Sequence, residues 1–178
     1  PGFGLRRLLL DESRSPKGQL QPGERKSLQT DRVILMPGPD REITVVREVY
    51  EQFVQRRLAE RDIADRLNAR GIRTDLGRAW TRGTVHQLLT NEKYVGNNVY
   101  NRTSFKLKQK HVRNAPEMWV RHDGAFEGVV SVELFNAAQQ VIAERSHRFD
   151  EQTMLDLLKG LYDRTGALSG LLIDEQEG

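Results

Sequence analysis

The amino-acid sequence predicts a mainly helical α+β fold, in which a helix-turn-helix-like bundle is joined to a small antiparallel β component. Apolar residues recur at helical spacing in four stretches: 40–54, 62–70, 81–91 and 131–142. The second and third stretches are separated by an irregular connection and form a helix–connection–helix unit. Short apolar runs at 5–10 and 32–36 predict the β component.

The composition indicates a soluble protein with a modest core. The chain has 178 residues, 30% of them charged and 37% apolar, which is enough for one ordinary domain or two small ones. No apolar run approaches the ~20 residues that span a bilayer, so we expect no membrane partner and a cytoplasmic location. The absence of cysteine excludes disulfides and a Cys-based zinc ribbon within these residues. Because the first residue is proline, we expect the chain to begin inside a longer polypeptide.

Positive charge is concentrated in one block of the sequence. Residues 61–113 contain 12 Lys/Arg and 4 Asp/Glu, whereas the rest of the chain contains 16 Lys/Arg and 21 Asp/Glu. A basic block in an otherwise mildly acidic protein is typical of a surface that binds a polyanion. A solvated charged surface is the alternative interpretation.

The first part of the chain predicts two strands followed by a helix. The runs at 5–10 and 32–36 are read as strands joined by an exposed loop at 12–29, which is rich in turn-forming residues. Asp40 is the expected N-cap of the first helix. The inward-facing residues of that helix would be Ile43, Val46, Tyr50, Phe53 and Val54.

Glycine and threonine mark the ends of the helices in the helix–connection–helix unit. Gly71 supplies the left-handed position after the first helix, and Thr81 caps the second. Trp80 is assigned to the core between them rather than to stacking on a base. The inward-facing residues would be Ile63, Ala64 and Leu67 in the first helix and Val85, Leu88 and Leu89 in the second.

The remaining residues predict short strands, one more helix and a separate C-terminal segment. The expected strands are 97–101, 117–123 and 124–130, and residues 102–114 form either an arm of a basic hairpin or a loop. Ser131 caps a helix. We therefore predict one domain at 1–145 and a partial helical appendage at 146–178, with a helix over 150–164.

The second helix of the unit exposes side chains that can read DNA. Arg82 can form a bidentate contact with guanine, and Gln87 or Asn91 with adenine. Thr81, Thr84 and the N-terminal amides of the helix suit phosphate oxygens. The connection before the helix is longer than the 3–4 residues of a plain helix-turn-helix, so structural packing alone is the alternative.

No catalytic arrangement is visible in the sequence. The four histidines are dispersed without metal-binding spacing, and neither a phosphate-binding glycine loop nor a GxSxG turn is present. We therefore predict no catalytic residue, no metal and no cofactor in this chain.

Three separated blocks resemble the recombinase domain of large serine recombinases, within the resolvase–invertase family of site-specific recombinases. The blocks are IADRLNARGI at 63–72, GRAWT at 77–81, and NEKYVG at 91–96, and the resemblance covers about residues 1–145. It implies a DNA-binding module that follows a catalytic domain, whose serine forms a phosphoserine link to DNA during strand exchange in a tetramer. That catalytic domain would precede residue 1, so Ser13, Ser15 and Ser27 are not candidates for the nucleophile.

The resemblance and the charge pattern together predict a partner and a binding surface. The partner is a double-stranded DNA recombination site, and the resemblance implies a homo-oligomer for the full-length protein. The helix at 81–91 would lie in the major groove. The predicted DNA-binding residues are Arg73, Arg78, Thr81, Arg82, Thr84, His86, Gln87, Asn91, Lys93, Tyr94, Arg102, Lys106, Lys108, Lys110 and Arg113.

Three other functions are compatible with the residues alone. The first is a transcriptional regulator with a winged-helix-like fold. The second is a DNA-processing nuclease, which would require metal-dependent cleavage by this chain. The third is a protein-interaction scaffold, for which salt-sensitive binding to duplex DNA would be absent.

Overall fold

The computed structural model describes residues 1–104, 112–147 and 154–160. It confirms the predicted α+β class: within these ranges, helices form most of the secondary structure and the β-sheets are antiparallel. The chain divides into two compact units, Pro1–Gln139 and Gln140–Gly178. The division falls inside one helix, and the predicted boundary after residue 145 stays a prediction.

The N-terminal part forms a three-stranded sheet in the order β2-β1-β3. The strands are β1 (Leu5–Leu10), β2 (Pro16–Leu20) and β3 (Arg32–Pro37), and β1 pairs antiparallel with both neighbours. β2 corrects the prediction of an uninterrupted loop at 12–29. Its sequence, PKGQL, is mostly polar, and only its last residue is buried. Because β2 is held by backbone pairing with β1, its sequence shows none of the apolar alternation from which a strand is predicted.

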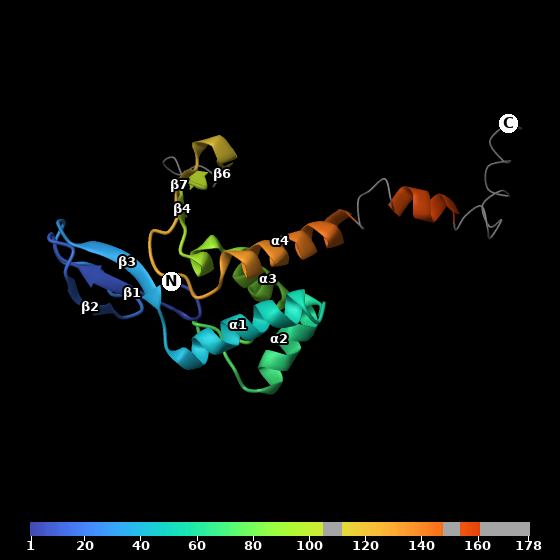
Figure 1. Cartoon of the computed structure of the whole chain (residues 1–178), viewed down its shortest axis with the longest axis horizontal. Helices are drawn as coiled ribbons and strands as arrows, with labels where there is room; N and C mark the ends of the chain where they lie inside the picture. The colour runs from blue at the N-terminus through green and yellow to red at the C-terminus, as the bar shows by residue number, and fades with distance from the viewer. Residues whose placement is uncertain (105–111, 148–153, 161–178) are drawn as a thin grey trace, which may run out of the picture. The chain divides into compact units, whose positions relative to one another are not determined.

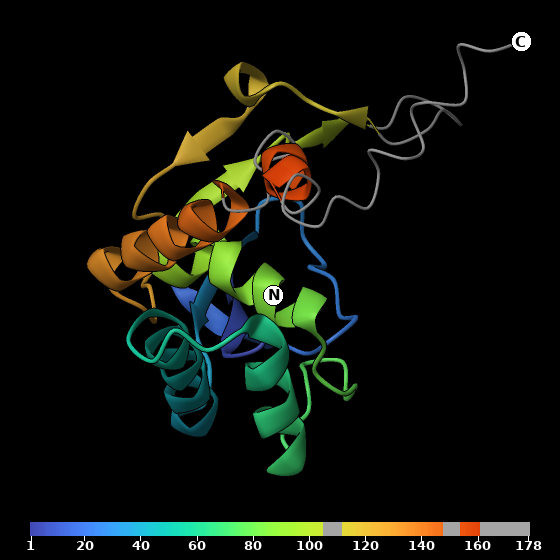
Figure 2. The same ribbon diagram turned by 90° about the vertical axis from the view of Figure 1, so that its right-hand side faces the viewer.

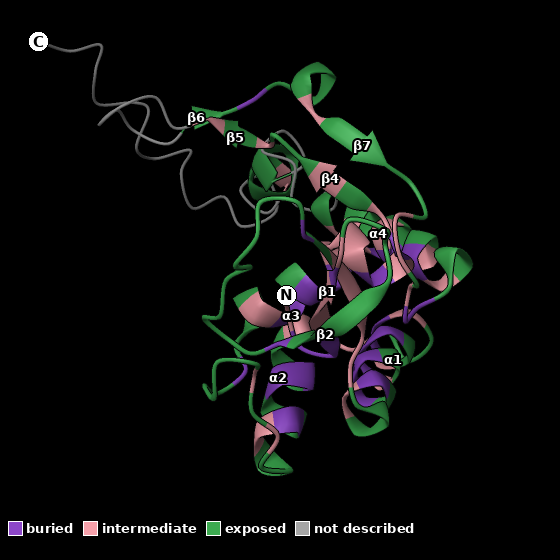
Figure 3. Ribbon diagram, turned by 90° about the vertical axis from the view of Figure 1, so that its left-hand side faces the viewer, coloured by how far each residue is buried: buried purple, intermediate pink, exposed green. Residues whose placement is uncertain are grey.

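Three helices pack against one another beside this sheet (Figure 1). They are α1 (Asp40–Val54), α2 (Glu60–Ala69) and α3 (Arg82–Thr90), and Figure 2 shows α3 lying across α1 and α2. The buried faces of α1 and α2 appear in purple in Figure 3. The residues predicted to face inward are buried, except that Val54 is half-buried: Ile43, Val46, Tyr50, Phe53, Ile63, Ala64, Leu67, Val85, Leu88 and Leu89.

The helix ends agree with the sequence at three of the four predicted positions. Gly71 has a φ of 70°, and Thr81 caps α3. Ser131 caps α4 through a 3.3 Å bond from the Leu134 N–H. Asp40, expected as an N-cap, is instead the first residue of α1, and the cap position is Pro39, which makes no side-chain cap bond.

The connection between α2 and α3 is tied to α2 by one side chain. Asn68 Nδ2 donates to the Trp80 carbonyl at 2.9 Å, and the Trp80 N–H donates to Asn68 Oδ1 at 2.8 Å. The Trp80 ring is buried and packs edge-on against Phe3, which confirms its assignment to the core. Tyr50 of α1 donates to the Leu88 carbonyl at 2.9 Å, so α1 also supports the last turn of α3.

A short 3₁₀ helix, η1 (Glu92–Val95), follows α3 and ends at Gly96, whose φ is 86°. The predicted strand at 97–101 is present as β4 (Asn98–Tyr100), which pairs antiparallel with β7 (Val120–His122). β5 (Thr103–Ser104) pairs with β6 (Val112–Arg113), so the two ends of the segment 102–114, which was predicted to be one hairpin arm or a loop, pair with each other. A second 3₁₀ helix, η2, spans Pro116–Met118.

The strand predicted at 124–130 does not form. The N–H groups of Val129 and Val130 both donate to the Tyr94 carbonyl, at 2.8 and 3.0 Å. Two consecutive N–H groups that share one acceptor do not form the alternating bonds of a strand ladder; here they bind the backbone of η1. Both valines are buried at this contact, which explains the apolar pattern in the sequence.

The last described elements are helical. α4 spans Val132–His147, and residues 154–160 are also helical. The helix predicted at 150–164 thus lies partly outside the described residues. No helix in the described ranges is long and apolar enough to span a membrane.

Candidate nucleic-acid interface

One face of α3 is exposed and polar. Val85, Leu88 and Leu89 are fully or nearly fully buried, whereas Arg82 and Gln87 are exposed on the other side of the helix. An α-helix inserted into a major groove must combine such an exposed polar face with a buried apolar one. α3 therefore meets the first geometric condition for reading DNA.

The N-terminus of α3 is fixed by a capping box. The Thr81 hydroxyl accepts from the Thr84 N–H at 3.2 Å, and the Thr84 hydroxyl accepts from the Thr81 N–H at 2.8 Å. The reciprocal bonds satisfy two of the helix's unpaired N–H groups and use both threonine hydroxyls. Both threonines thus have a structural role in addition to the phosphate contacts predicted for them.

Two side chains of the α3 face converge on Glu60, at the start of α2. Glu60 Oε2 accepts from Arg82 Nε at 3.2 Å, and Glu60 Oε1 lies 2.7 Å from His86 Nδ1. Because a carboxylate only accepts hydrogen bonds, the proton of that second bond lies on Nδ1. The Glu60 side chain is 11% exposed, but that of Arg82 is 80% exposed, so the guanidinium reaches solvent while its Nε is bound to Glu60.

The connection 73–78 forms a compact turn beside α3. The Thr74 N–H donates to the Arg78 carbonyl at 2.9 Å, and the Thr74 hydroxyl accepts from the Arg78 N–H at 3.1 Å. Arg73 and Arg78 are exposed at either end of the turn, and Leu76, at its tip, is 72% exposed. The turn thus presents two cations to solvent.

A cleft of about 650 Å³ separates this turn from α3. Its α3 side includes Thr81, Thr84 and Gln87. Asn91 also borders the cleft, but its side-chain oxygen accepts from the Lys93 N–H at 3.2 Å and so caps η1. Asn91 and Lys93 are half-buried, whereas Gln87 is exposed.

A protein-family model described as "Recombinase" matches residues 40–145. The match covers more than half of the chain and includes all three helices of the bundle. The chain belongs to the recombinase family. The family match confirms the resemblance to a recombinase domain that the sequence showed.

Among solved structures, the recombinase chain matches one described as "Crystal Structure of a LSR-DNA Complex". The two share 21% sequence identity, with a TM-score of 0.42, over 70% of this chain and 34% of that chain. The chain therefore spans about a third of the length of that solved relative. No curated protein matches it.

Several predicted DNA-binding residues lie elsewhere in the recombinase chain. Tyr94 is buried, and its hydroxyl donates to the Phe3 carbonyl at 2.9 Å. Burial raises the pKa of Tyr94, so the phenol stays protonated and bound inside the protein. We therefore leave Tyr94 out of the proposed DNA surface. Lys106, Lys108 and Lys110 lie outside the described residues, and Arg113 is exposed in β6.

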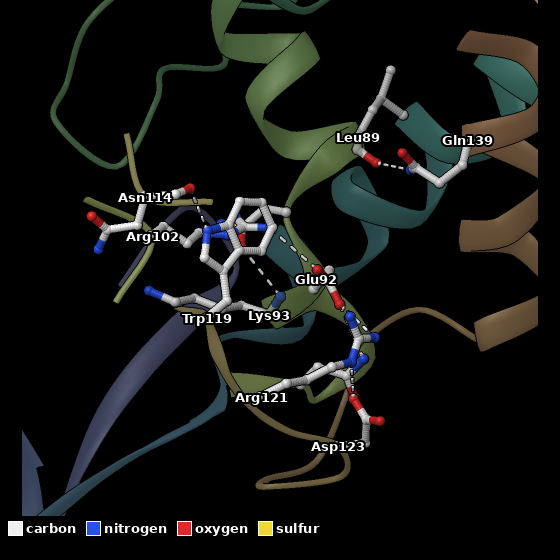
Figure 4. Close-up of polar contacts among 11 residues, drawn as sticks. Leu89, Glu92, Lys93, Arg102, Asn114, Trp119, Arg121, Asp123 and Gln139 are labelled. Carbon is white, nitrogen blue, oxygen red and sulfur yellow. Dashed lines mark hydrogen bonds and ion pairs between the residues drawn. The ribbon is translucent and has the colours of Figure 1, made fainter. Parts of the chain in front are cut away.

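Arg102 belongs to a network that the sequence did not predict (Figure 4). Its guanidinium lies 4.7 Å from the centre of the Trp119 ring, and its Nη2 donates to Glu92 Oε1 at 3.2 Å. Arg121 Nη2 contacts the other Glu92 oxygen at 2.6 Å. Glu92 thus joins η1 to the β4–β7 pair, and Arg102 has a structural role there.

The described residues contain no group of three or more His, Asp or Glu side chains placed to hold a metal ion. The predicted DNA-binding side chains that this part of the chain brings together are those of α3 and the neighbouring turn. The sequence analysis missed Glu60 and Glu92. Each contacts residues of other elements, and such contacts leave no periodic pattern in the sequence.

Proposed function

We propose that this chain is the DNA-binding domain of a serine site-specific recombinase and that α3 reads bases in the major groove of a recombination site. The observation that carries the proposal is the combination of the recombinase-family match with the exposed polar face of α3. The basic balance of residues 61–113 supports a polyanionic partner.

In this proposal, the residues of the surface have different roles. Arg82 and Gln87 read base edges from α3, while His86 lies beside them on the same face. Arg73 and Arg78 hold phosphates next to the groove from the exposed turn. Strand cleavage and rejoining through a phosphoserine, and assembly of a tetramer, belong to the full-length protein.

The experiment is a selection of bound duplexes from a randomised pool, followed by affinity measurements on the selected duplex and its single-base variants. Arg82→Ala is expected to lose ~1–3 kcal/mol of discrimination at one or two positions of the site. Arg78→Ala is expected to weaken binding to all duplexes and to reduce the slope of log K against log salt by about 1.

Arg32→Ala provides the charge-matched control, because Arg32 is exposed at the end of β3 opposite to α1. It should leave both the discrimination and the salt slope unchanged. Equal losses on every duplex from Arg82→Ala would contradict base reading. A wild-type chain that selects no sequence and shows no salt-sensitive binding would contradict the proposed function as a whole.

A further inference from the structure

Glu60 is the one acidic side chain that contacts two residues of the exposed α3 face among the described ion pairs. We infer that Glu60 is a positioning residue for DNA reading: it fixes the directions of Arg82 and His86 before DNA arrives. This inference rests on the proposed function and adds a determinant of sequence specificity from outside the recognition helix.

The geometry favours a holding role over a simple surface ion pair. Glu60 is 11% exposed and is the first residue of α2, where a negative charge is favoured by the helix dipole. One oxygen accepts from Arg82 Nε and the other from His86 Nδ1. Each donor thus has its own oxygen, so a glutamine in this place would lose one of the two bonds, because its amino group cannot accept.

The bond to Glu60 uses Arg82 Nε, which leaves the terminal amino groups of the guanidinium available for a base. The two terminal amino groups of the guanidinium lie beyond Nε, on a side chain that is 80% exposed. A guanine contact can use those terminal groups while Glu60 retains Nε. The carboxylate therefore restricts the rotamers of Arg82 without occupying the end that would meet a base.

Restricting Arg82 in advance changes the energetics of recognition. A free arginine side chain loses rotamer entropy when a base fixes it, and that loss opposes binding to the correct site. A side chain held by Glu60 loses less, and it also adapts less readily to a wrong base. The negative charge of Glu60, in contrast, repels phosphates on every duplex. Glu60 should thus lower general affinity and raise discrimination.

The opposite effects on general affinity and on discrimination distinguish a positioning residue from a merely structural one. Glu60→Ala is expected to bind unrelated duplexes more tightly than wild type, while its discrimination at the position read by Arg82 falls by about fivefold, the effect of one typical hydrogen bond. Glu60→Gln, which keeps the shape and one acceptor oxygen, should fall between Glu60→Ala and wild type in discrimination.

Asp65→Asn is the matched control. Asp65 is exposed on the same helix, so the substitution removes the same charge from α2 without touching the α3 face. It should raise affinity for unrelated duplexes and leave discrimination unchanged. Thermal unfolding of each variant, followed by circular dichroism, shows whether the bundle is intact at the temperature of the binding measurement.

A mutant cycle tests whether Glu60 acts through its two partners. In a chain already carrying Arg82→Ala and His86→Ala, adding Glu60→Ala should change discrimination no further. A further loss there, or unchanged discrimination in the single Glu60→Ala variant of a folded chain, would overturn the inference. Both results presuppose that the wild-type chain selects a sequence, so the failure of the proposed function is a separate, recognisable outcome.

Discussion

Asn68 and Trp80 exchange two hydrogen bonds across the connection between α2 and α3. The side-chain amide of Asn68 donates to the Trp80 carbonyl and accepts from the Trp80 N–H, at 2.9 and 2.8 Å. The amide thus pairs with one residue of backbone as a neighbouring strand would. Since α3 begins two residues after Trp80, this contact sets where the proposed recognition helix starts.

Replacing Asn68 should destabilise the bundle. Asn68→Ala leaves the N–H and the carbonyl of Trp80 without their partners at a part-buried site, which typically costs about 1–3 kcal/mol. The free energy of unfolding from urea titration measures the loss. Asn136→Ala, at an exposed position of α4, is the control and should change stability by less than about 0.5 kcal/mol. Equal effects from both variants would show that the Asn68 pair contributes nothing.

Gly96 should not tolerate a side chain. A Cβ there would lie 2.3 Å from the Phe126 carbonyl oxygen, and the φ of 86° is unfavourable for other residues. Gly96→Ala should therefore combine backbone strain with a steric clash and cost about 2–4 kcal/mol.

Gly71→Ala isolates the two contributions to that loss. Gly71 has a φ of 70° but no atom within 4 Å of the added Cβ, so only the backbone strain of about 1 kcal/mol remains. Parallel urea titrations of the two variants give the difference. If Gly96→Ala were no more destabilising than Gly71→Ala, the close approach of Phe126 would be relieved by a backbone shift.

The acid stability of the chain should depend on Glu42. Burial raises the pKa of Glu42, but hydrogen bonds from Arg6 and from the Gly4 N–H outweigh this effect, and the net pKa lies below the ordinary 4.5. A carboxyl with a lowered folded-state pKa stabilises the fold above its unfolded pKa, and this contribution is lost as pH falls through the folded-state value. Stability should therefore decline as pH drops below 4.5.

Comparison of variants assigns that decline to Glu42. Glu42→Gln should reduce stability at neutral pH and flatten the dependence on pH in the acidic range, as measured by urea titrations from pH 3 to pH 7 (about the span over which carboxyls titrate). Glu51→Gln, exposed on the same helix, should keep the wild-type slope. An unchanged slope in Glu42→Gln would assign the acid sensitivity to other carboxyls.

The Glu92 network should stabilise the β4–β7 pair locally. Glu92→Gln weakens the contacts with Arg102 and Arg121, which are partly exposed, so the loss should be about 1 kcal/mol. Faster amide hydrogen exchange in β4 and β7, with unchanged exchange in α1, is the expected signature. Glu117→Gln, at an exposed position of η2, provides the control. Uniform acceleration throughout the chain would contradict a local role.

The sequence predicted the helical bundle well because each helix carries its own signals. Apolar spacing identified the buried faces of α1, α2 and α3, and Gly71 and Thr81 marked two helix ends. Local patterns are sufficient where a helix contacts the core along one stripe. β2 was missed since its residues are mostly exposed and its pairing uses backbone groups alone.

Contacts between distant residues were beyond prediction from the sequence. Glu60 meets His86 across 26 positions, and Asn68 meets Trp80 across 12, in each case through a single polar side chain. Such contacts have no periodicity. The valines at 129 and 130 show the converse error, because an apolar pair predicted a strand where the backbone instead clamps η1.

The residues that carried the family resemblance turn out to build the scaffold. Asn68 and Trp80 pair with each other, Thr81 and Asn91 cap helices, and the Tyr94 hydroxyl binds the Phe3 carbonyl. The proposed base-reading side chains lie between these positions. In the proposed function, the base-reading side chains could thus change without altering the contacts that hold the helices together.

If α3 reads bases as proposed, its nine residues limit the number of base pairs that one copy of the chain contacts through this helix. At ~1.5 Å per residue the helix is roughly 13 Å long, which matches about four base pairs at ~3.4 Å each. A word of four base pairs recurs by chance about once in 250, far too often to mark one place among the ~10⁶–10⁹ competing positions of a genome. The proposed recognition of a single recombination site would thus require further base contacts, from other surfaces of the protein or from several copies of it.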